Sequence, residues 1–144
     1  MDGVNYILLG FHFLLIIALY RIMKKRKKRM PSYFGSHVAM FTGGGFSLGL
    51  GVILIHSFPV HYLEVTACTA LSGMLIGSIF GAMFGNHTML TGYGTGLLLG
   101  LLSPLLGITS LYSFSFILII ELFIFCSFIV LVIITNTSRK EQIE

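Results

Sequence analysis

Long apolar runs separated by short polar segments divide the chain into five stretches, each long enough to cross a bilayer. A membrane-spanning helix needs about 20 predominantly apolar residues, and each run has about this length. The pattern therefore predicts an all-α membrane protein with five transmembrane helices in a single domain. The predicted spans cover approximately residues 4–23, 37–55, 63–84, 90–108 and 113–134.

Glycine recurs at every fourth position in the third and fourth spans. Positions four apart lie on one face of a helix, and small residues let helix backbones approach closely in lipid. The two series mirror each other about an expected turn at Asn86–Met89, with Gly85 facing Gly92 and Gly81 facing Gly96. We predict a tight glycine-zipper hairpin, with packing residues Gly73, Gly77, Gly81, Gly85, Gly92, Gly96 and Gly100.

A second pattern suggests an internal repeat. The segment Thr42–Gly51 aligns with Thr91–Gly100 at a constant offset, and both segments enter the membrane from the same side. This indicates a parallel hairpin repeat, spans two–three and four–five, of the kind found in some transporters. The alternative is a chance similarity between two segments rich in Gly and Leu, because spans three and five show no clear match.

Positive charge is concentrated between the first two spans. Of the nine Lys and Arg residues, all but Arg139 and Lys140 lie within residues 21–29. Five spans place both basic groups on one side, and the positive-inside rule makes that side cytoplasmic and the N-terminus external. Residues 24–31 then form a basic cytoplasmic loop and residues 135–144 a cytoplasmic tail. The loop is interpreted as a topology signal, with binding of anionic lipid headgroups as the alternative.

The overall composition agrees with a membrane domain. Hydrophobic residues make up 56% of the chain and charged residues 10%, and the mean hydropathy is +0.95. The sequence pI of about 9.3 comes from one basic cluster, so we expect no nucleic-acid partner. We expect no enzyme activity, because no arrangement of nucleophile and base is visible. Cys68 and Cys126 offer no disulfide framework.

Glu121 is the most informative polar residue because it lies inside an apolar run. A charge at the bilayer centre costs about 2.5–3.5 kcal/mol on insertion scales, so such a side chain normally faces a partner within the protein. His12 in the first span and Ser72 in the third fall at a similar predicted depth. We expect Glu121 to point into the bundle and to contact His12 or Ser72. The contact would be a proton or cation site, or a structural link between the first and fifth spans.

Metal-ligating residue types gather near both ends of the spans. Histidine, carboxylate and thiolate suit zinc or copper, and histidine with thioether suits a soft metal ion. The ordinary alternative is interfacial histidine together with methionine that fills packing gaps, and the sequence requires no cofactor. The candidate ligands are His56, His61, Glu64 and Cys68 at the outer end, and His37, Met40, His87 and Met89 at the cytoplasmic end.

These features favour a small multi-pass transport or channel-type protein for a cation or proton, with Glu121 and His12 as the ion site. We expect it in the cell (plasma) membrane of a bacterium. Five short helices enclose no wide path alone, so we expect a homo-oligomer or a subunit of a larger membrane complex. One alternative is a non-transporting membrane scaffold whose glycine faces dock a partner. The other is a membrane protein that handles copper or zinc.

Overall fold

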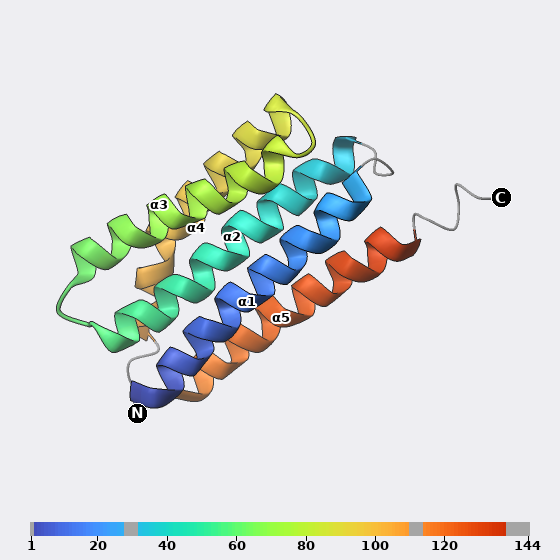
Figure 1. The fold of residues 1–144 in the computed structure, drawn as a ribbon. Helices are drawn as coiled ribbons and strands as arrows, with labels where there is room; N and C mark the ends of the chain where they lie inside the picture. The colour runs from blue at the N-terminus through green and yellow to red at the C-terminus, as the bar shows by residue number, and fades with distance from the viewer. Residues whose placement is uncertain (1, 28–31, 110–113, 138–144) are drawn as a thin grey trace.

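The computed structural model describes residues 2–27, 32–109 and 114–137, which form five helices (Figure 1). Each helix is long and apolar enough to cross a membrane, and consecutive helices run in opposite directions. The predictions of an all-α chain and of five candidate spans are confirmed. The helices are α1 (Asp2–Arg26), α2 (Ser32–Ser57), α3 (Tyr62–Ala82), α4 (Asn86–Thr109) and α5 (Phe114–Thr137).

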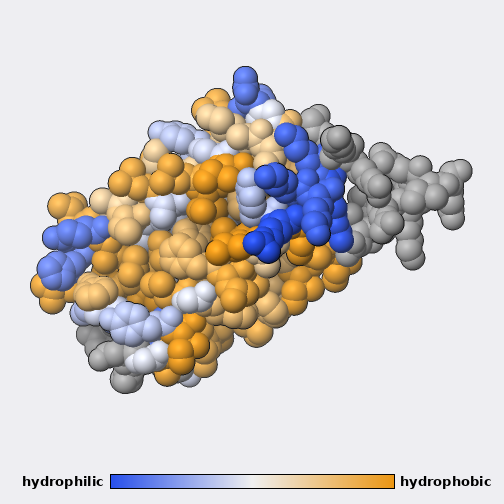
Figure 2. Space-filling view, in the orientation of Figure 1, coloured by the Kyte–Doolittle hydropathy of each residue, from blue (hydrophilic) through white to orange (hydrophobic). Residues whose placement is uncertain are grey.

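The basic residues Lys24, Lys25 and Arg26 form the last turn of α1. This differs from the prediction, which places them in a loop. Lys and Arg are good helix formers, and positive charge is favourable at a helix C-terminus, so the helix continues through them. Figure 2 shows hydrophilic residues gathered at this end of a largely apolar surface. We call it the basic end, and the opposite end the far end. Residues 28–31 of the predicted loop and 138–144 of the predicted tail lie outside the described residues.

The central helix of the bundle is α2. In the apolar stretch of α2, 72% of the residues are buried, whereas in the apolar stretches of the other four helices between 22% and 39% are buried. In Figure 1, α3 and α4 lie together on one side of α2, and α1 and α5 lie on the other side. The second span is therefore the one most shielded from the surroundings.

The glycines of α2 allow neighbours to approach it from several directions. Successive positions on a helix point to different sides of its axis, so four of these glycines meet four different helices. A Cβ built on Gly43 would meet α3, one on Gly44 would meet α4, one on Gly45 would meet α5, and one on Gly49 would meet α1. The glycine-rich sequence of α2 thus explains its central position.

Glycines also form the close contact between α3 and α4. A Cβ on Gly77 would overlap the backbone carbonyl of Gly92, and one on Gly96 would overlap that of Gly73. Rotation of a side chain cannot relieve these overlaps, because the obstructing atoms belong to the backbone. Gly43 of α2 packs against the same contact, since a Cβ on Gly43 would lie 2.7 Å from the Cα of Gly77. Three backbones therefore meet around Gly77.

The α3–α4 hairpin turns one helical turn earlier than predicted. The turn takes Met83–Gly85 and not Asn86–Met89, which begins α4. Gly81 consequently meets the backbone of Thr88, and the expected pairing of Gly81 with Gly96 is wrong.

Gly85 accounts for this difference. Its φ of 141° is one that residues with side chains rarely adopt, and a Cβ there would meet nothing within 4 Å. Gly85 is therefore the turn glycine, and its expected role as a packing residue is wrong. The Oγ1 atom of Thr88 lies 2.6 Å from the carbonyl oxygens of both Gly81 and Gly85, which holds the start of α4 against the end of α3.

The helices α4 and α5 do not repeat the α2–α3 hairpin. The third helix packs along both α2 and α4, whereas α5 packs on α2 and is separated from α4 by a groove. At one of the shared positions, a Cβ on Gly51 would meet Ser103 of α4, whereas one on its counterpart Gly100 would meet α3. The predicted parallel hairpin repeat is therefore not found in this arrangement.

Candidate functional site

Glu121 and His12 lie next to each other where α1, α2 and α5 meet. The Nδ1 atom of His12 is 3.2 Å from Oε2 of Glu121, and the side chains are 0% and 11% exposed respectively. Both α1 and α5 begin at the far end. At about 1.5 Å per residue, ten residues of α1 and seven of α5 bring the two side chains to similar depths. The expected contact between the first and fifth spans is thus present.

Gly49 of α2 forms the third side of this site. A Cβ there would overlap the ring of His12 and would lie 3.0 Å from Oε1 of Glu121. A side chain at position 49 would therefore push the pair apart. The sequence had not assigned this role to Gly49, although the density of glycine in the second span was the signal that pointed to it.

Several polar atoms of the pair lack a hydrogen-bond partner among the described residues. They are both ring nitrogens of His12 and the Oε1 atom of Glu121, all of them buried. The 3.2 Å contact has the distance of an ion pair, but its direction does not make it a hydrogen bond. Most buried polar groups in proteins are hydrogen-bonded, and leaving one unbonded costs about 1–3 kcal/mol. The site therefore has unused capacity to bind a proton or a small polar species.

The surroundings of the pair are apolar. The ring of Phe46 lies 5.6 Å from that of His12. A cleft of about 230 Å³ between α1 and α5 reaches Glu121 from the surface, and all its other lining residues are apolar. In a bilayer this cleft faces acyl chains, so Glu121 is approached from the side by lipid and not by bulk water.

A polar contact lies between His12 and the far end of the bundle. Asn5, two turns before His12 on the same face of α1, is 6% exposed and donates from Nδ2 to the Oγ atom of Ser57 (3.1 Å). The neighbouring His56 has a buried Nδ1 atom without a hydrogen-bond partner among the described residues. The polar contact of Asn5 was not predicted from the sequence. The available signal was an asparagine inside an apolar run, seven residues before His12.

Ser72 does not belong to the site. It lies on α3, and its hydroxyl donates to the carbonyl oxygen of Thr69 in the same helix (3.0 Å). The groups around Glu121 come from α1, α2 and α5. The expectation that Ser72 contacts Glu121 is therefore wrong.

The candidate metal ligands at the far end do not form a coordination centre. The Nδ1 atom of His61 lies 3.6 Å from Oε1 of Glu64, but both side chains are exposed, and a surface ion pair of this kind contributes little. Cys68 is a free, exposed cysteine. Within the described parts of the chain, no three or more His, Cys, Asp or Glu side chains are placed to hold a metal ion. Of the remaining candidates, His56 is half-buried, and His87 and Met89 are exposed on α4.

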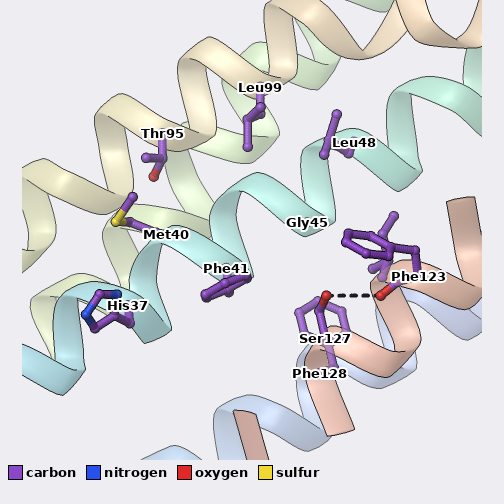
Figure 3. Close-up of a pocket in the computed structure, with 11 residues that line it drawn as sticks. His37, Met40, Phe41, Gly45, Leu48, Thr95, Leu99, Phe123, Ser127 and Phe128 are labelled. Carbon is purple, nitrogen blue, oxygen red and sulfur yellow. Dashed lines mark hydrogen bonds between the residues drawn. The ribbon is translucent and has the colours of Figure 1, made fainter. Parts of the chain in front are cut away.

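His37 and Met40, the other two candidate ligands, line the groove between α2, α4 and α5 (Figure 3). This groove has a volume of about 350 Å³. Its hydroxyls are bonded within their own helices: Ser127 donates to the carbonyl oxygen of Phe123 (3.0 Å), and Thr95 to a carbonyl oxygen one turn earlier (2.8 Å). The groove is therefore an apolar surface without a set of converging polar groups.

Comparisons with protein-family models, with curated proteins and with solved structures found no match. The geometry of the His12–Glu121 pair is therefore the basis on which a function is inferred.

Proposed function

We propose that this protein moves protons or a small cation across a membrane, with His12 and Glu121 as the exchange site. The supporting observation is the buried pair with unbonded Nε2 and Oε1 atoms, held among five apolar helices. Ionisable residues within membrane spans are costly and are functional sites by default. A pair with a structural role alone would be expected to be fully hydrogen-bonded.

The chemistry of the pair suits an exchange between a proton and a cation. With one proton shared between imidazole and carboxyl group, the pair is neutral overall. Loss of that proton leaves one negative charge, which is costly in apolar surroundings unless it is compensated. A small cation beside Oε1 of Glu121 provides that compensation, so proton and cation occupy the site in alternation.

A proton or cation reaches the His12–Glu121 site more favourably from the far end than from the basic end. The contact between Asn5 and Ser57 and the half-buried His56 place polar groups between His12 and that end. Towards the basic end, α1 instead contributes the buried apolar side chains of Leu19 and Met23. Transfer to the basic end therefore requires a movement of α1 or α5, or a second subunit at the α1–α5 cleft.

The proposed assembly is a homo-oligomer, or a larger membrane complex in which this chain is one subunit. Four helices packed around α2 leave little room for a continuous path through a single chain. The basic end is assigned to the cytoplasm by the positive-inside rule, and the proposed location is the plasma membrane of a bacterial cell. A scaffold that docks partners through its glycine faces is less well supported, because Gly77, Gly92 and Gly96 are already in contact within the chain.

Labelling with a hydrophobic carbodiimide in sealed proteoliposomes tests the site. Such reagents enter the lipid phase and modify carboxyl groups that hold a proton. We expect Glu121 to be modified through the α1–α5 cleft, and the modification to decline as pH or cation concentration rises on the far side. The exposed Glu64 serves as the internal control, and the peptides are distinguished by mass spectrometry. The proposal is contradicted if Glu121 is not modified, or if its modification is independent of both pH and cation concentration.

A further inference from the structure

A second groove, between α1 and α3 near the basic end, combines an apolar surface with positive charge. Its volume is about 510 Å³. Isoleucine side chains of both helices and the rings of Tyr20 and Phe80 form most of its lining, and Arg21 and Lys24 complete it. It is therefore distinct from both the His12–Glu121 site and the groove of Figure 3.

The two cations share one face of α1 because they are three residues apart. The Nζ atom of Lys24 lies 5.8 Å from the ring centroid of Tyr20, which orients the lysine side chain along the groove. Tyr20 in turn contacts Phe80 of α3, with ring centroids 5.9 Å apart. An aromatic contact that joins the two helices thus lies beside the two charges.

Neither described glutamate neutralises these cations. Glu121 lies beside the buried His12, and Glu64 lies beside His61. Arg21 and Lys24 are both exposed, so they are available to an external anion. Guanidinium and ammonium groups at the cytoplasmic end of membrane helices are typical ligands of anionic lipid headgroups.

We propose that this groove binds one anionic phospholipid, with its phosphate between Arg21 and Lys24 and an acyl chain along the isoleucines. The groove extends along α1 from Ile16 to Lys24, which is about 12 Å at 1.5 Å per residue. One leaflet of hydrocarbon is about 15 Å deep, so an acyl chain and a headgroup fit in register. The bound lipid would join α1 to α3. This inference does not depend on the proposed transport function.

The test is the binding of phosphatidylglycerol to the full chain in neutral detergent, followed by native mass spectrometry and by thermal unfolding. We expect one retained phosphatidylglycerol per chain and a higher Tm than with phosphatidylcholine. In the double variant R21Q/K24Q the affinity should fall roughly tenfold or more, since each cation contributes to headgroup attraction. The matched control is K25Q/K27Q, which removes the same charge from exposed positions that do not line the groove. This control should retain the lipid.

A further variant, I79W, tests the apolar half of the groove with both cations intact. Ile79 is 48% exposed and lines the groove, so a larger side chain should fill the space for the acyl chain and reduce binding. Equal loss in both double variants would show general attraction to a charged surface and overturn the site. Equal binding of phosphatidylcholine, or full binding by I79W, would also overturn it.

Discussion

The Oε1 atom of Glu121 lies 3.0 Å from the position that a Cβ would take on Gly49. The same Cβ would overlap the ring of His12, so the absence of a side chain at position 49 allows the pair to meet against α2. A glycine in the central helix thus determines the geometry of residues on α1 and α5. Gly49 therefore contributes both to the packing of α2 against its neighbours and to the proposed exchange site.

The substitution Gly49→Ala should displace the His12–Glu121 pair. Overpacking a well-packed site typically costs about 1–3 kcal/mol, so we expect a lower Tm and impaired flux in liposomes. The control is Gly10→Ala on α1, where a Cβ would meet nothing within 4 Å. There the better helix propensity of alanine should leave the protein as stable or slightly more stable. Equal behaviour of the two variants would contradict the role given to Gly49.

The α3–α4 contact predicts a sharp difference between neighbouring glycines of α4. Gly92→Ala places a methyl group against the backbone of Gly77 and should destabilise the protein by about 1–3 kcal/mol. Gly94→Ala, two residues along the same helix, meets nothing within 4 Å and should be tolerated. Thermal unfolding in detergent measures both. If Gly92→Ala unfolds at the temperature of the parent, the close contact does not exist in the folded protein.

Thr69 should stabilise the hairpin through the carbonyl of Gly100. Pro104 lacks a backbone N–H, so this carbonyl loses its usual donor within α4. The hydroxyl of Thr69 lies 2.8 Å from it, and that of Ser103 lies 3.0 Å from it. Thr69→Val should cost about 0.5–1.5 kcal/mol. Thr66→Val, which removes a hydroxyl bonded within α3 only, should cost less when both are measured by thermal unfolding.

Cysteine accessibility tests the proposed topology. In a variant without Cys68 and Cys126, a cysteine at the highly exposed Val60 of the far end should react with an impermeant maleimide added outside intact cells. A cysteine at Lys27 of the basic end should react only after the membrane is opened. Reaction of position 27 in intact cells would reverse the orientation, and reaction at both positions would contradict a spanning bundle.

The sequence predicts the number of helices from the lengths of the apolar runs, and it places His12 and Ser72 at the depth of Glu121. Depth alone does not select His12 as the partner, because it carries no information on the order of the helices around the bundle. The sequence does not predict the central position of α2, since apolar residues are required equally on a lipid-facing surface and in a protein core. It also leads to the wrong hairpin register. Gly85 continues the four-residue glycine series but takes a φ of 141° and forms the turn, and residue spacing alone does not separate these two roles.

The His12–Glu121 site itself is tested most directly by ion flux in liposomes. The purified chain is reconstituted with a pH-sensitive dye inside, and an opposing gradient of protons and of sodium or potassium is imposed. We predict that the parent dissipates the gradient, that Glu121→Gln is folded but inactive, and that Glu64→Gln retains the activity of the parent. Flux through Glu121→Gln at the rate of the parent would contradict the assignment of the pair as the exchange site, and the absence of flux in the parent would contradict transport by this chain alone.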